Sequence, residues 1–330
     1  MCPAMVETMM YAKEMPWHKS GFYVGDKEIN SEQAIVAAGL DWEVELKKVF
    51  ADSVNGPVLC PDNYAVLRKT DNSVLGLVGN RYAIVQNKNA FDFFDSVVGE
   101  KLAMYHTAGS LYGGKKVWML AKLPDNIKVK GKDHIEKYLL LSTTHDGSGT
   151  LKMFFTPVRV LCANTLILAH KGFNAEEGIS IRHTANAMNK MDQAKQTLGF
   201  AVEHYKQFEV ELNFLADQKF NDMQMKMALQ KLFPAKDETD VPTRTENMRN
   251  TVWSLYQNAE NLKDYRGSAY AAWNSINEFA MHHKTLKDKD NPDSQLNSIW
   301  FGSGAQLSAK SFDLIFKMAK DPNLNPNLRA

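Results

Sequence analysis

The nine histidines of this 330-residue chain are the side chains best suited to acid–base or metal chemistry, because an imidazole titrates near neutral pH. His282 and His283 are adjacent, so on a helix they point about 100° apart and ligate one metal ion poorly. Three further candidates are isolated in the sequence, and only the fold could bring them together: His106, His145 and His183. The spacing therefore predicts no metal site, and an enzymatic site assembled from these three histidines with acidic neighbours is an open alternative.

The sequence lacks the motifs of phosphate loops, metal hydrolases and activated nucleophiles. It contains no GxxxxGK[ST], no GxGxxG between a strand and a helix, no HExxH, no CxxC and no G-x-S-x-G. The run Gly147-Ser148-Gly149 is better explained as a hairpin turn, and Glu176-Glu177 as a solvated loop than as a general acid–base pair. We therefore predict a protein that is not an enzyme and that needs no cofactor.

Cysteine content and hydropathy indicate a compartment. Cys2, Cys60 and Cys162 are too few and too scattered for a disulfide framework or a zinc site. There is no apolar run near the roughly 18 residues of a membrane span, and no basic start followed by an apolar stretch. The composition, 44% hydrophobic and 23% charged, is that of an ordinary globular protein. We expect a cytoplasmic protein of a bacterial host cell, without a membrane partner.

The net charge of +1 conceals an asymmetry along the chain. Residues 101–200 carry 14 Lys and Arg against 7 Asp and Glu, whereas residues 1–100 have a net charge of −5 and residues 201–330 of −1. Such a basic block favours a polyanionic partner. The alternative is a solvated face with local ion pairs.

Basic residues of this block alternate with aromatic residues, as a groove for single-stranded nucleic acid requires. Lysine and arginine neutralise phosphates, and rings offer a flat partner to unstacked bases. The predicted nucleic-acid-binding residues are Lys115, Lys116, Lys152, Phe154, Arg159, Arg182 and Lys190. The aromatic residues have an alternative role, because large rings such as Trp118, Phe154 and Phe155 commonly fill the core.

Strands are expected to position most of these residues. Residues 1–30 are expected to form an irregular arm, and residues 125–137 a polar connector with Lys128, Lys130 and Lys132. Turn signals at Gly113-Gly114 and at 146–149 each predict a hairpin. Further strands are predicted over 41–50, 64–70 and 74–79, with turns at 55–57 and 61–63, and helices over 31–39, 87–99 and from about 162 to 170.

The apolar pattern becomes helical beyond residue 184. Helices are predicted over 184–218, 223–233, 243–260, 270–284 and 312–320. Because strands dominate the first half and helices the second, we predict an α+β fold. Its antiparallel hairpin sheet would occupy the N-terminal and central part, packed with helices. The predicted domains are 1–184, with the basic centre, and 185–330, a helical region that packs on it or mediates assembly.

Eight stretches carry a family resemblance. They are PWHKSG (16–21), GLDWEVELK (39–47), YAVLRKTDNSVLGLVGNRYAIVQN (64–87), TAGSLYGGKKVWMLAKLP (107–124), THDGSGTLKMFFTPVRVLCANTL (144–166), RHTAN (182–186), WNSINEFAMHHK (273–284) and SIWFGSGA (298–305). Together they resemble the phage/plasmid-like protein family, which carries a domain of unknown function on phages, prophages and plasmids. The resemblance spans nearly the whole chain and implies a mobile-element protein without an established activity.

A second resemblance is to the order of elements alone. A helix at 89–99, hairpin strands over 102–160 and a helix at about 162–170 are similar to the core of the phage single-strand annealing recombinases. This implies a homo-oligomer that binds single-stranded DNA along a basic groove, in recombination or replication, with annealing as a further activity. The alternative is a phage or plasmid protein-interaction factor, a host-defence inhibitor or assembly component, that contacts a host or phage protein. Its contact surfaces would be the Met-rich helix 223–233 and the aromatic helices of 251–280, unless these pack in the core.

Overall fold

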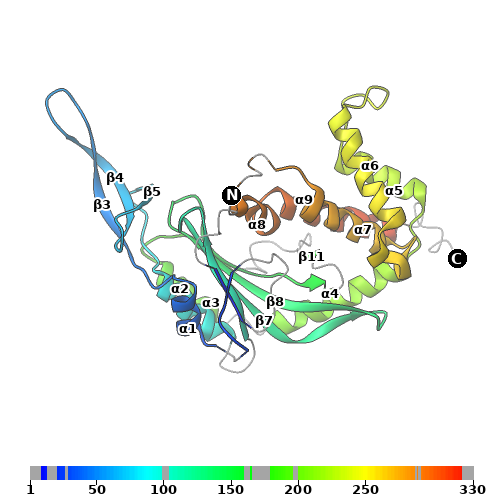
Figure 1. The fold of residues 1–330 in the computed structure, drawn as a ribbon, viewed down its shortest axis with the longest axis horizontal. Helices are drawn as coiled ribbons and strands as arrows, with labels where there is room; N and C mark the ends of the chain where they lie inside the picture. Colours follow the sequence, from blue (N-terminus) through cyan, green and yellow to red (C-terminus); the bar gives the residue numbers. More distant parts are fainter. Residues whose placement is uncertain are drawn as a thin grey trace. The chain divides into compact units, whose positions relative to one another are not determined.

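The computed structural model describes residues 9–12, 21–26, 29–98, 104–159, 164–165, 179–195, 200–286, 288 and 291–321. These residues form an α+β fold, as predicted (Figure 1). The chain divides into two compact units, each made of three segments. Unit 1 comprises Met1–Pro124, Tyr138–Phe155 and Ala175–Phe200, and unit 2 comprises Asp125–Lys137, Thr156–Asn174 and Ala201–Ala330. The division into domains 1–184 and 185–330 stays a prediction, because a compact unit need not fold on its own.

The strands form two sheets. The strands are β1 (Met9–Tyr11), β2 (Phe22–Tyr23), β3 (Val44–Ala51), β4 (Val58–Arg68), β5 (Val74–Gly79), β6 (Met104–Leu111), β7 (Lys116–Val129), β8 (Asp133–Thr144), β9 (Leu151–Phe155), β10 (Val158–Arg159), β11 (Asn164–Thr165) and β12 (Ile179–Ile181). The larger sheet has the order β11-β10-β8-β7-β6-β1-β2, and β9 pairs with both β8 and β12. The smaller sheet has the order β3-β4-β5.

Helices lie mainly in the second half. They are α1 (Ser31–Ala37), α2 (Asn87–Val98), α3 (Ala187–Lys195), α4 (Phe200–Asp217), α5 (Asp222–Leu232), α6 (Thr243–Asn258), the 3-10 helix η1 (Glu260–Tyr265), α7 (Ala269–Glu278), the π-helical turn η2 (Phe279–His283), α8 (Pro292–Trp300) and α9 (Ser303–Lys320). Of the predicted helix 184–218 the structure describes α3 and α4, and residues 196–199 lie outside the described part of the chain. Within the described helices, none is long and apolar enough to cross a membrane.

Unit 1 contains a long hairpin, β3–β4. Figure 1 shows it in blue, extending beyond α1 and α2. Its strands pair as far as Ala51 opposite Val58. The predicted turn at 61–63 is wrong: these residues lie inside β4, where the register shifts beside Val49 and Asp62 adopts φ 61°. A bulge accommodates the proline and the turn-type residues that suggested a break.

The prediction of an irregular arm over 1–30 is also wrong in part. Residues Met9–Tyr11 form β1, which pairs with β6 through Met10 opposite Ala108, and Met10 is fully buried. All three residues of this short strand are buried, so the sequence lacks the alternation of apolar and polar residues that indicates a strand. Much of PWHKSG, residues 16–20, lies outside the described residues.

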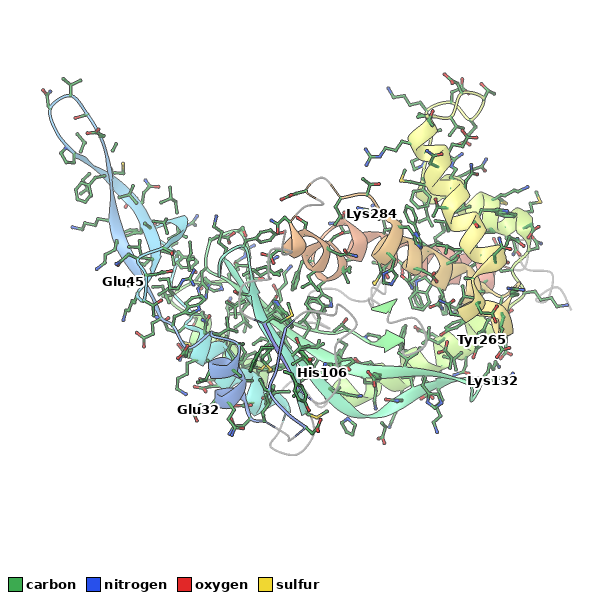
Figure 2. All side chains as sticks on the ribbon, viewed as in Figure 1. Glu32, Glu45, His106, Lys132, Tyr265 and Lys284 are labelled. Atoms are coloured by element: carbon green, nitrogen blue, oxygen red, sulfur yellow. The ribbon has the colours of Figure 1, made fainter. Side chains whose placement is uncertain are left out.

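The predicted connector 125–137 is instead the continuation of a hairpin in unit 2. Strand β7 runs to Val129 and β8 begins at Asp133. Its lysines pair locally: Lys130 bonds Asp217, and Lys132 lies 3.8 Å from Asp264. Figure 2 shows Lys132 beside Tyr265, whose hydroxyl donates to the Val129 carbonyl at 3.0 Å. Two of the three lysines expected in the connector are therefore ion-paired.

Helix α7 is the centre of unit 2. Every residue from Ala269 to Asn277 is buried. Trp273 packs edge-on against Phe312 of α9 at 4.9 Å and against Phe208 of α4 at 6.1 Å between ring centroids. The aromatic residues of 251–280 are thus largely core, the alternative that their size favoured. The helix expected from about residue 162 is contradicted at 164–165, which form β11, and residues 166–170 lie outside the described residues.

Candidate nucleic-acid interface

A stack of three side chains in unit 1 anchors the β6–β7 turn that carries Lys115. The Arg68 guanidinium donates to the Gly113 carbonyl at 2.6 Å and lies over the Trp42 ring at 5.0 Å. Trp42 in turn contacts the His145 ring edge-on at 5.3 Å. A side chain at Gly114 would lie 3.1 Å from Trp42, and the φ of Gly114 is +90°. The turn therefore needs glycine both for its backbone conformation and for its contact with the stack.

His145 ties the next turn, β8–β9, to the same place. Its backbone N–H donates to the Lys115 carbonyl at 2.8 Å, and its Nε2 lies 2.8 Å from Asn87 Oδ1. Because Asn87 donates its amide hydrogen to the Leu40 carbonyl, its Oδ1 is the acceptor and His145 carries its proton on Nε2. Burial lowers the pKa of His145 to about 3, so the imidazole is neutral.

The β8–β9 turn also packs unusually closely on β5. A side chain at Gly76 of β5 would lie 2.8 Å from the carbonyl carbon of Asp146, and one at Gly147 would lie 2.8 Å from Val78. The Asp146 carboxylate accepts hydrogen bonds from the N–H and hydroxyl of Ser148. The Gly-Ser-Gly run is a hairpin turn, as predicted. Gly76 lets β5 approach the backbone of this turn, and Gly147 leaves room for the Val78 side chain.

Three of the predicted cations lie on one face of the sheet in unit 1. Lys152 of β9 is opposite Ser142 of β8 and Ser180 of β12. Arg182 comes two residues after Ser180 and therefore points to the same side, with its Cα roughly 7–8 Å from that of Lys152. Lys116 lies close enough to Lys152 for that positive charge, after burial, to lower the pKa of Lys116, against the opposing effect of Asp146. We call Lys116, Lys152 and Arg182 the cationic face.

Lys152 and Arg182 are exposed and form no ion pair with any described residue. Lys115 is likewise exposed and without an ion pair among the residues described, in the turn just before Lys116. Phe154 is half-buried, two residues beyond Lys152 on the same side of β9. Trp118 and Phe155 are buried and belong to the core. The structure thus leaves Phe154 as the accessible aromatic residue of the three.

Two predicted residues lie elsewhere. Lys190 is exposed on α3, which packs with α2. Helix α2 bonds His145 through Asn87, so this helical layer covers the sheet face opposite to that of Lys152. Arg159 pairs with Ile135 and Asn164 in unit 2, and its side chain lies outside the described residues.

A groove adjoins the cationic face. Its volume is about 880 Å³, and it is lined by Asp62, Asn63, Leu77, Val78, Gly79, Asn80, Arg81, Tyr82, Gly147, Ser148, Gly149, Thr150, Arg182, His183 and Thr184. Arg81 and Arg182 both line it, and both are exposed. Sequence reasoning missed Arg81, because it belongs to the acidic first hundred residues. Its segment meets that of Arg182 only through long-range contacts, such as the 3.0 Å bond from the Ala83 N–H to the His183 carbonyl. The only local sign was an arginine two residues after the predicted strand 74–79.

His183 forms the buried base of this groove. It is 5% exposed, stacks on Tyr82 with 5.2 Å between ring centroids, and places Nε2 3.1 Å from Thr143 Oγ1. Burial lowers the pKa of His183 to about 4 and raises that of Tyr82. His183 Nδ1 has no hydrogen-bond partner within the described part of the chain.

The three candidate histidines do not form one site. His145 and His183 are close enough for the charge of His183 to lower the pKa of His145. His106 instead packs on Tyr138 at 5.5 Å between ring centroids. Tyr138 precedes His145 by seven residues along β8 and its end, roughly 23 Å in an extended strand. Over the described ranges, no three His, Cys, Asp or Glu side chains gather closely enough to hold a metal ion.

Comparison with known protein families identifies the family of this chain. Residues 74–300 match the family described as domain of unknown function DUF932. The chain belongs to the DUF932 family. The match begins at β5 and contains the groove residues Arg81 and Arg182 and the three cations of the cationic face. No curated protein matches the sequence significantly. No solved structure matches it significantly either.

Proposed function

We propose that this DUF932 protein binds single-stranded DNA through the cationic face of unit 1. The observation that carries the proposal is that Lys116, Lys152 and Arg182 share one side of the sheet, while Lys152 and Arg182 lack an ion pair with any described residue. A solvated face with local pairing was the alternative. Elsewhere in unit 1 that alternative holds, since Lys69 bonds Glu43 at 2.6 Å and Lys88 lies 3.2 Å from Asp92.

Several features support single-stranded rather than double-stranded DNA. Arg182 follows β12, which is an edge strand among the described strands, and Lys152 lies on its neighbour β9. A single strand can follow such an edge while its bases turn toward a ring. Phe154 is the accessible ring on the same side. Phosphate neutralisation and base stacking together give affinity with little sequence preference, which suits annealing.

The wider setting belongs to the same proposal. The ordered motifs resemble the phage/plasmid-like proteins, and the order of helix and hairpins resembles the single-strand annealing recombinases. We therefore extend the proposal to a cytoplasmic, homo-oligomeric protein of a phage or plasmid that takes part in recombination or replication without enzymatic activity of its own.

Fluorescence anisotropy with a labelled dT oligonucleotide tests the proposal. Lys152→Gln and Arg182→Gln should each weaken binding at low salt by about 3- to 10-fold, because each removes one phosphate contact. Lys88→Gln is the matched control, because it removes an exposed lysine of the same unit that is already paired with Asp92. Lys190→Gln should also have little effect, since α3 covers the other sheet face. Absence of binding by the wild-type protein at low salt, or equal losses in all four variants, contradicts the proposal.

The alternative function, a protein-interaction factor, now has a different motivating observation. In the Met-rich helix Met225, Ala228 and Leu229 are buried, so one face of the helix is core, whereas Met223 is 72% exposed. The β3–β4 hairpin instead presents apolar side chains to solvent: Phe50 and Leu59 are paired across its strands, and both are exposed. Large exposed apolar residues in neighbouring positions are typical of protein contact sites.

Affinity purification from phage- or plasmid-bearing cells separates the two functions. Recovery of one defined protein partner by the wild type, lost with Phe50→Ser and Leu59→Ser but kept with Lys152→Gln, would favour the interaction factor. Recovery of nuclease-sensitive DNA, lost with Lys152→Gln and kept with Phe50→Ser, would favour the DNA-binding protein.

A further inference from the structure

The groove beside the cationic face has the features of an anion site. Arg81 enters it from the segment after β5, and Arg182 from the end of β12. Neither guanidinium group forms an ion pair or hydrogen bond with a described residue. This sets them apart from Arg68 and Arg249, whose guanidinium groups bond Gly113 and Glu238. The charged residues that line the groove are Arg81, Arg182 and Asp62, so the arginines leave an excess of one positive charge.

The acidic residues at the groove are already engaged. Asp62 lines the groove and accepts a hydrogen bond from Asn80 at 3.0 Å. Asp146, next to the lining glycines, accepts from Ser148 at 2.6 Å and 2.9 Å. Asn80 follows β5, Ser148 belongs to the same turn as Asp146, and neither carboxylate forms an ion pair with Arg81 or Arg182. The guanidinium groups are therefore left for a ligand.

Two stacked rings, those of His183 and Tyr82, line the groove beside the arginines. His183 lines the groove, is 95% buried and has no hydrogen-bond partner for Nδ1 within the described residues. This nitrogen is inaccessible to solvent, so the groove offers a ligand the His183 and Tyr82 rings rather than a free hydrogen-bonding atom. With a pKa of about 4, His183 is neutral at physiological pH and contributes polarity without charge.

We propose that the groove binds the phosphate group of a nucleotide between Arg81 and Arg182. A guanidinium presents parallel N–H donors that match two oxygens of a phosphate, and two arginines can hold one phosphate from two sides. The volume of about 880 Å³ admits a nucleotide as well as its phosphate. The choice of a nucleotide as the source of the phosphate rests on the proposed function. The binding of the phosphate group itself is inferred from the two arginines alone.

Phosphorus-31 NMR titration of the full chain with dTMP and with inorganic phosphate tests this assignment. Arg81→Gln and Arg182→Gln should each weaken dTMP binding about tenfold, as expected for the loss of a charge-assisted pair of hydrogen bonds. Arg81→Lys should recover part of the affinity, because it restores charge without the planar fork. Lys88→Gln should leave the titration unchanged, and circular dichroism should show each variant folded.

Three results separate this inference from the proposed function. Arg81-dependent binding of dTMP tighter than that of inorganic phosphate supports the nucleotide site, even if long oligonucleotides fail to bind. Equal affinity for dTMP and inorganic phosphate would overturn the choice of a nucleotide. Oligonucleotide binding that depends on Lys152, together with dTMP binding that is absent or unchanged in Arg81→Gln, would overturn the groove assignment and leave the strand-binding proposal standing.

Discussion

Asn87 and His145 join helix α2 to the β8–β9 turn through a hydrogen bond of 2.8 Å between His145 Nε2 and Asn87 Oδ1. The same asparagine bonds the Leu40 carbonyl through its amide nitrogen at 2.9 Å. Both side chains are buried, with 1% of Asn87 and none of His145 exposed. One side chain thus satisfies two buried polar groups from separate segments, and its bond to His145 holds the turn next to the cationic face.

Replacing Asn87 with Ala should lower the free energy of unfolding by about 2–4 kcal/mol, because it leaves the His145 N–H and the Leu40 carbonyl buried without partners. Urea unfolding followed by tryptophan fluorescence measures the change. Asn89→Ala on the same helix is the control, since Asn89 is half-buried and makes no hydrogen bond through its side chain with a described residue. Equal losses from the two variants would contradict the role given to Asn87.

The buried histidines predict acid sensitivity. The folded pKa is about 3 for His145 and about 4 for His183, both lowered mainly by burial. In the unfolded chain both titrate near 6.5, so below that pH only the unfolded state takes up protons. Stability is therefore fully present above pH 6.5 and falls as the pH drops toward 4, by up to about 1.4 kcal/mol per histidine and pH unit.

Urea unfolding at pH 7, 6 and 5 checks this dependence above the range in which most carboxylates titrate. His183→Gln should make the loss of stability between pH 7 and 5 smaller, because one of the two groups no longer titrates. His283→Gln is the control, because His283 is exposed. A wild-type protein whose stability is constant from pH 7 to 5 would show that the two histidines titrate normally in the folded state.

Gly76 and Gly79 of β5 give a matched pair for the packing of the β8–β9 turn. A side chain at Gly76 would overlap the backbone of Asp146, whereas one at Gly79 would meet only the Asp62 carbonyl at 3.9 Å, an ordinary contact. Gly76→Ala should cost about 1–3 kcal/mol of stability, as overpacking does, and should weaken DNA binding by displacing the turn. Gly79→Ala should do neither. Thermal unfolding and anisotropy measure both effects, and indistinguishable variants would rule out the close approach.

Local turn chemistry made part of this architecture predictable. Gly113-Gly114 and the 146–149 run predicted two hairpins, and these hairpins bring Lys115, Lys116 and Lys152 to one end of the sheet in unit 1. The helices of unit 2 followed from their apolar spacing, and the hairpin in 125–137 was missed because its short alternation of Ile127 and Val129 is crowded with lysines.

Contacts between distant segments were not predictable from one sequence. The pairing of Ser180 with Lys152 places Arg182 beside the groove, and nothing local to Arg182 indicates that pairing. Arg81 was overlooked because charge was counted over whole thirds of the chain, and the first third is acidic. Lys190 was included because it is close in sequence to Arg182, although a helix turns it to the other layer. Charge patterning along a chain thus identifies a basic region but not the face on which its members meet.

The salt dependence of oligonucleotide binding tests the central claim most directly. For single-stranded DNA, the logarithm of the association constant falls with the logarithm of salt concentration by about 0.7 per neutralised phosphate. If Lys152 and Arg182 each neutralise a phosphate, the double variant Lys152→Gln/Arg182→Gln should bind with a slope shallower by about 1.4 than the wild type. Binding by the wild type with the same slope as the double variant, or no salt-dependent binding at all, would contradict the claim that the cationic face holds the DNA backbone.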